Sequence, residues 1–178
     1  MKKALVLAAC LLLSSSVAAE ARPKTLHWSA GWDEYGEPLD FDKSNIKWSV
    51  DQNSKTLKVV FTLIGAVPNK LYQVGFHIFG QCPASFGQFL NIGCSSVTAG
   101  GVTRSMACIE FGVVTTDMSG NGTFSVTVGP LPSGVYKGEF GARNGAGCGL
   151  RGGGGNSTCN VVFLSPGPFG ATTRIEVD

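Results

Sequence analysis

The sequence has few of the residues that enzyme sites usually require. Of its 178 residues only two are histidines, His27 and His77, and it contains no Cys-x-x-Cys, Gly-x-Ser-x-Gly, His-Glu-x-x-His or Walker-type lysine loop. Hydrolases are recognised by such combinations of nucleophile, base and metal ligand. We therefore expect a protein that is not an enzyme and holds no cofactor. Two catalytic carboxylates far apart in the chain would leave no motif, and this alternative stays open.

Charged residues are also scarce. The chain has 14 Lys and Arg residues against 12 Asp and Glu residues, and no charged residue occurs between Leu71 and Thr103. Nucleic-acid binding depends on a basic surface that displaces counterions from phosphates. Because the sequence has no run of Lys or Arg, we expect no nucleic-acid partner.

The N-terminus has the pattern of a secretory signal peptide. Lys2 and Lys3 precede an apolar run from Ala4 to Leu13, and small residues follow. The run is too short for a membrane-spanning helix. We expect residues 1–19 to be removed, with cleavage after residue 21 as the alternative. Residues 20–178 would then form a single secreted or periplasmic domain that is not transmembrane and, with 12 basic and 12 acidic residues, carries no net charge.

Five cysteines remain after such cleavage, and export would place them where disulfides persist. Their odd number requires a free thiol or a bond to another chain. Spacings of 12 and 11 residues suggest the pairs Cys82–Cys94 and Cys148–Cys159, which leaves Cys108 reduced or bonded between chains. The sequence alone does not decide this pairing.

Apolar residues alternate with polar ones along most of the chain, which is the pattern of β-strands. Gly, Pro and Asn clusters separate these runs, and no stretch after the signal shows helical periodicity. We predict an all-β fold, a single antiparallel β-sandwich of immunoglobulin-like Greek-key form with about eight or nine strands, and one alternative form of the sandwich is named below. Residues 141–159 are glycine-rich and are expected to form a loop. The alternating residues are Leu57, Val59, Phe61 and Leu63; Val74, Phe76 and Ile78; Ile109, Phe111 and Val113; Phe124, Val126 and Val128; Tyr136 and Phe140; and Ile175 and Val177.

One short stretch, Gly75-Phe76-His77-Ile78, resembles a strand that carries copper ligands in the copper-zinc superoxide dismutases. The resemblance implies a β-sandwich of dismutase-like form, as the alternative to the immunoglobulin-like Greek-key form, and a copper ligand at His77. That family has a second histidine two positions later, where this chain has Phe79, and it needs six histidines for its two metals. We therefore expect no dismutase activity. In the alternation His77 lies with Gly75 and Phe79, opposite the apolar face.

Residues 27–51 combine aromatic and acidic side chains. Aromatic faces beside carboxylates suit the apolar faces and hydroxyls of sugars, so this segment is a candidate carbohydrate-binding site. The ordinary alternative is that the tryptophans fill the core and the acids lie on an exposed loop. The candidate ligand-binding residues are Trp28, Trp32, Tyr35 and Trp48.

The acids of the same segment are candidates for a calcium site, because Ca²⁺ prefers six to eight oxygen ligands. The candidate ligands are Glu37, Asp40 and Asp42. Lys43 and Lys47 add positive charge beside them, so we expect a solvated acidic turn without metal.

Three functions follow from these patterns. The first is a secreted or periplasmic, non-enzymatic β-sandwich module with a binding or structural role in the envelope or the extracellular space. The second is a carbohydrate-binding module that uses residues 27–51. The third is a degenerate dismutase-like metal-binding protein. A protein or a polysaccharide would be the partner, and the sequence does not identify it.

Overall fold

The computed structural model describes residues 22–30, 37–79, 92–99, 102–145, 161–165 and 173–178. For residues 79, 92–99 and 102–108 only the backbone is described. This described part contains strands and no helix, so the prediction of an all-β fold is confirmed. It accordingly has no helix long and apolar enough to cross a membrane. The predicted signal peptide lies outside the described residues.

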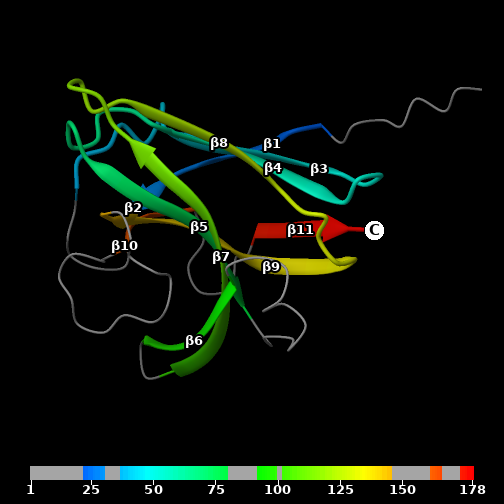
Figure 1. Cartoon of the computed structure of the whole chain (residues 1–178). Helices are drawn as coiled ribbons and strands as arrows, with labels where there is room; N and C mark the ends of the chain where they lie inside the picture. The colour runs from blue at the N-terminus through cyan, green and yellow to red at the C-terminus, as the bar shows by residue number, and fades with distance from the viewer. Residues whose placement is uncertain (1–21, 31–36, 80–91, 100–101, 146–160, 166–172) are drawn as a thin grey trace, which may run out of the picture.

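The strands form two antiparallel sheets (Figure 1). The described residues hold eleven strands, more than the eight or nine expected. The four-stranded sheet has the order β1-β3-β4-β8, formed by Lys24–His27, Asn45–Asp51, Thr56–Leu63 and Gly122–Val128. The seven-stranded sheet has the order β2-β10-β9-β5-β7-β6, with β11 also paired to β9. Its strands are β2 (Ser29–Ala30), β5 (Leu71–Phe79), β6 (Ile92–Ala99), β7 (Val102–Thr115), β9 (Gly134–Asn144), β10 (Val161–Leu164) and β11 (Thr173–Val177).

The predicted alternation determines which residues enter the core. In β4 the four predicted apolar residues, Leu57, Val59, Phe61 and Leu63, are all fully buried, while the residues between them are partly or fully exposed. Val74 and Phe76 of β5 are buried as well, but so are Gln73, Gly75 and His77 beside them, and the predicted Ile78 is only partly buried. Successive side chains of a strand point to opposite faces, so one face of each sheet collects the apolar residues.

Aromatic side chains of the two sheets contact each other between these apolar faces. The ring of Phe140 in β9 lies 5.5 Å from Trp48 in β3 and 5.9 Å from Phe61 in β4, measured between centroids. Phe61 also lies 5.6 Å from Phe111 in β7. Such tilted and edge-on pairs add to the burial of apolar area. The core therefore lies between the two sheets.

The predicted alternation of β7 is wrong after Phe111, because the strand contains a bulge. Gly75 pairs with Glu110 and Val74 with Gly112, which leaves Phe111 as the extra residue. One extra residue reverses the faces of all that follow, so Val114 is buried and Val113 is only partly buried. Gly112 has φ +149°, and a Cβ there would lie 2.5 Å from the ring of Phe124.

The C-terminal part of the seven-stranded sheet was only partly predicted. β9 continues to Asn144, so the expected glycine-rich loop starts later than residue 141. β10 has four buried residues in a row, and this strand was missed because a strand covered on both faces does not alternate.

Candidate functional site

The candidate aromatic residues that the structure describes lie in the core. Trp28 is 2% exposed, and its indole N–H donates to the carbonyl of Thr62 at 3.2 Å. Trp48 is 6% exposed and packs on Phe140. Neither indole offers an open face on which a sugar ring could stack. Trp32 and Tyr35 lie outside the described residues.

The three candidate calcium ligands do not share one site in the structure. The carboxylate of Glu37 accepts hydrogen bonds from the Lys70 ammonium and, at 2.6 Å, from the Tyr72 hydroxyl. Asp40 accepts from the ammonium of Lys43 at 2.7 Å, and this hydrogen bond lowers the pKa of the Asp40 carboxyl. Asp42 is exposed in the adjoining turn.

The described side chains contain no group of three or more His, Cys, Asp and Glu residues that could hold a metal ion. Cys94 lies in β6 and Cys108 in β7, where only the backbone is described. The other candidate disulfide partners, Cys82, Cys148 and Cys159, lie outside the described residues, so the predicted pairing stays a prediction.

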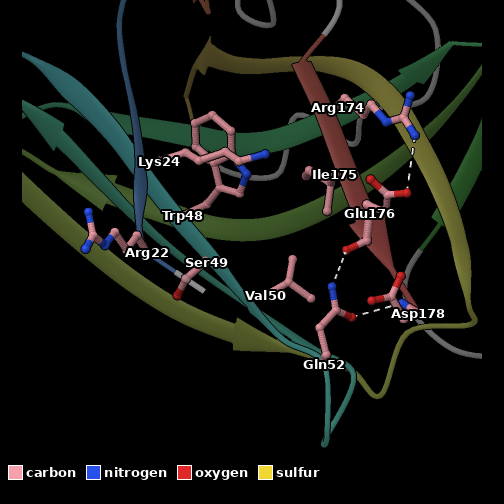
Figure 2. Close-up of a pocket in the computed structure, with 10 residues that line it drawn as sticks. All are labelled: Arg22, Lys24, Trp48, Ser49, Val50, Gln52, Arg174, Ile175, Glu176 and Asp178. Carbon is pink, nitrogen blue, oxygen red and sulfur yellow. Dashed lines mark hydrogen bonds and ion pairs between the residues drawn. The ribbon is translucent and has the colours of Figure 1, made fainter. Parts of the chain in front are cut away.

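An open groove lies between β3 and β11, beside Trp48 (Figure 2). Its volume is about 210 Å³. Its lining includes the cationic side chains of Arg22 and Lys24; in the figure Lys24 lies beside the Trp48 ring and Arg22 farther to one side. The complete lining is Arg22, Lys24, Trp48, Ser49, Val50, Gln52, Arg174, Ile175, Glu176 and Asp178.

One end of this groove is closed by hydrogen bonds between β11 and the end of β3. Gln52 Nε2 donates to the carbonyl of Glu176 at 3.0 Å, and the Asp178 N–H donates to Gln52 Oε1 at 2.9 Å. Arg174 contacts the Glu176 carboxylate at 3.2 Å. The charges at this end are therefore mixed, whereas the end near β1 is cationic.

A second groove adjoins the first on the outer face of the four-stranded sheet. Its volume is about 330 Å³, and it shares Arg22, Trp48 and Ser49 with the first groove. Lys47 and Lys58 line it. We call the two adjoining grooves the basic groove.

Four exposed cations of the basic groove lack an ion-pair partner in the described part of the chain: Arg22, Lys24, Lys47 and Lys58. Lys47 pairs with Val60 and Ser49 with Lys58, so the two lysines are diagonal neighbours on adjacent strands. Diagonal neighbours lie about 7–8 Å apart. Like charges at this distance raise the local potential and attract anions.

Sequence reasoning missed the basic groove because its cations are spread over residues 22–58. The only signal was the stretch Asp51-Gln52-Asn53-Ser54, whose residue types are typical of a turn; the strands on either side of it pair and bring Lys47 and Lys58 together. The nearly equal numbers of basic and acidic residues in the chain, 14 and 12, concealed this local concentration of positive charge.

Comparisons with known proteins supply no assignment. No protein-family model matches the chain, and no curated protein is significantly similar to it.

Proposed function

We propose that this chain is an exported, non-enzymatic β-sandwich module that binds an anionic polysaccharide of the cell envelope or the extracellular space through the basic groove. The observation that carries the proposal is the group of four exposed cations around Trp48 that have no ion-pair partner among the residues that the structure describes. The shared aromatic core between two antiparallel sheets supports the finer assignment of a Greek-key sandwich.

The physical basis of this binding is electrostatic. Lys47 and Lys58 repel each other across the β3–β4 pair, and Arg22 and Lys24 add charge at the edge formed by β1. A ligand with regularly spaced carboxylates or sulfates would neutralise these charges. Each Lys or Arg near an anionic surface contributes about 1 kcal/mol at physiological ionic strength.

A polysaccharide fits the groove better than a folded acidic protein does. Ser49 offers a hydroxyl and Gln52 an amide beside the cations, which suits sugar hydroxyls. The two adjoining grooves, of about 210 and 330 Å³, share Arg22, Trp48 and Ser49, so that an extended ligand can contact both. Because the Trp48 indole is covered, we expect ionic and polar contacts in place of the aromatic stacking that the sequence suggested.

Binding to uronic-acid and sulfated polysaccharides, measured by titration calorimetry in a salt series, tests the proposal. Lys47→Ser combined with Lys58→Ser removes two of the four cations. At about 1 kcal/mol for each charge, affinity should fall about 30-fold. Binding should also weaken steeply as salt is added, because salt screens exposed charges.

The matched control is Lys43→Ser combined with Lys55→Asn, which changes the net charge equally. Lys43 contacts Asp40, and Lys55 donates to Ser133, so neither belongs to the basic groove. Affinity close to that of the wild type is expected for this control. Equal losses in both double variants, or equal binding of an acidic protein or single-stranded DNA, would contradict a polysaccharide site.

A further inference from the structure

Strand β8 forms an open edge of the four-stranded sheet (Figure 1). It pairs with β4 along its whole length, Gly122–Val128, and the register contains no bulge. No strand in the described part of the chain pairs with its other side. Alternate residues of an edge strand direct their N–H and C=O groups outward, where another strand can pair with them. β8 therefore offers a regular edge of seven residues for pairing.

The core-side residues of this edge strand are incompletely covered. Phe124, Val126 and Val128 pack against the core but are only partly buried. Their three partners on the neighbouring β4 are fully buried. The apolar interior thus continues to the open edge of the sheet. A further strand beside β8 would cover this surface, and burial of apolar surface favours association.

β8 lacks the features that usually keep edge strands apart. Native proteins protect sheet edges with short strands, charged side chains, prolines or bulges. Among the edge strands whose side chains the structure describes, β2 has two residues, β1 has four and contains Lys24, and β11 contains Arg174 and Glu176. β8 is the longest of this group, and its seven residues include neither a charged residue nor a proline.

The sequence of β8 is complementary to itself. In an antiparallel pair with a two-fold axis at Ser125, Thr123 lies opposite Thr127 of the second copy, and Phe124 lies opposite Val126 of the second copy. Threonine pairs and pairs of an aromatic with a β-branched residue stabilise neighbouring strands. No like charges face each other in this register, and the exposed hydroxyl face of one copy continues that of the other.

We propose that two copies of this chain form a dimer through antiparallel pairing of their β8 strands, with the two-fold axis at Ser125. The contact uses the same surface of both copies, so association closes at the dimer. Lys58 pairs with Thr127 and therefore lies in a different row from Lys58 of the second copy, so the two basic grooves do not repel each other at the axis. No residue of β8 lines either groove.

The dimer would join the two four-stranded sheets into one continuous sheet. Lys58 shares a face with Thr127, and Lys47 shares it with Ser125 through Val60, because paired residues lie on one face of a sheet. Both outer grooves would then open on the same face, where one long polymer can reach them together. This consequence rests on the proposed function, whereas the dimer itself does not.

Sedimentation equilibrium of the full chain over a concentration series tests the dimer. Interfaces smaller than about 1,200 Å² are usually weak and transient, so we expect a reversible dimer that forms at micromolar concentrations. Ser125→Lys places two ammonium groups directly opposite each other, while Ser125 is exposed in the single copy. This variant should dimerise at least about 10-fold more weakly.

The matched control is Val135→Lys, which adds the same charge on the other sheet. Val135 is 46% exposed and lies opposite Glu176, which suits a lysine. This control should dimerise as the wild type does. A monomer at every concentration up to about 1 mM, a mass that grows beyond the dimer, or equal weakening by both variants would overturn the proposal.

Hydrogen exchange of the wild type gives a readout that does not depend on how the variants fold. The amides of Gly122–Val128 should exchange more slowly at high protein concentration, whereas those of β1 and β11 should not change. Slower exchange in β1, β6 or β11 in place of β8 would overturn the proposed interface. If the basic groove binds a polysaccharide, long chains should bind more tightly than short fragments only above the concentration at which dimers form. Absence of any such binding would contradict the proposed function, while the measured mass alone decides the dimer.

Discussion

Replacement of Tyr72 by Phe tests the polar network at the start of β5. The Tyr72 hydroxyl donates to Glu37 at 2.6 Å and accepts from the Val67 N–H at 3.2 Å. Glu37 also accepts from the ammonium of Lys70, and its side chain is only 12% exposed. A hydrogen bond to a charged group contributes about 1.5–3 kcal/mol. We expect Tyr72→Phe to lower the free energy of unfolding by about 2 kcal/mol at pH 7.

The decrease in unfolding free energy caused by Tyr72→Phe should depend on pH, and this dependence tests whether the fold keeps the phenol neutral. Burial first, and then the Glu37 carboxylate, raise the pKa of Tyr72 well above its usual 10. The folded protein therefore keeps the phenol proton at a pH where the unfolded chain loses it. Stability from Tyr72 is full below pH 10 and falls by about 1.4 kcal/mol for each unit as pH rises above it. At pH 11 the wild type has lost about 1.4 kcal/mol, so the cost of Tyr72→Phe should shrink to about 0.6 kcal/mol.

Urea unfolding followed by tryptophan fluorescence measures the loss of unfolding free energy caused by Tyr72→Phe at pH 7 and at pH 11. Tyr136→Phe is the control, because burial also raises the pKa of Tyr136 but its hydroxyl donates to the neutral carbonyl of Pro132. It should cost about 1 kcal/mol at pH 7, the value of a neutral hydrogen bond. An undiminished cost of Tyr72→Phe at pH 11 would show that the fold does not hold the phenol in its neutral form.

Three further predictions follow. Gly138→Ala should destabilise the protein by about 3 kcal/mol or more in the same assay, because its Cβ would lie 1.9 Å from the carbonyl oxygen of His77; a loss below about 1 kcal/mol would refute this contact. Millimolar calcium should leave the melting temperature unchanged, since the carboxylate of Asp40 already contacts Lys43, and a rise that a chelator reverses would contradict this. Peptide mapping without reduction should find two bridges and leave Cys108 reduced or bonded between chains; a bridge from Cys108 to Cys82 or Cys94 within one chain would show the predicted pairing to be wrong. The predicted bridges are Cys82–Cys94 and Cys148–Cys159.

The sequence predicts the core residues well in strands that have one solvent-exposed face. β3 alternates strictly, and in β4 the predicted residues Leu57, Val59, Phe61 and Leu63 are the buried ones, while the apolar Val60 between them is only partly buried. Alternation carries this information because a half-buried strand must place every second side chain in the core. Alternation does not predict burial where a strand departs from this arrangement. This happens at the bulge beside Gly112 and in β10, whose residues are all buried.

Alternation is also an incomplete guide to burial on the outer face of the seven-stranded sheet. The alternation of β5 correctly placed His77 away from Val74 and Phe76. It could not show that this second face is also covered, because polar residues on a strand normally indicate solvent. The buried position of Glu139 beside His77 depends on the pairing of β5 with β9, which are far apart in the chain.

Only part of the basic groove could be predicted from the sequence. The other part shows why counting charged residues did not reveal the groove. The turn at 51–54 implies a hairpin, and its register, with Asp51 opposite Thr56, places Lys58 diagonal to Lys47. A short hairpin turn constrains that register locally, so two of the four cations follow from the sequence. Arg22 and Lys24 join them only because β1 pairs with β3 on its free edge, with Lys24 opposite Trp48. A strand of four residues has too little pattern to predict such a partner. A nearly balanced total of 14 basic and 12 acidic residues therefore does not exclude a cationic groove, because antiparallel pairing can bring together cations that are far apart in the sequence.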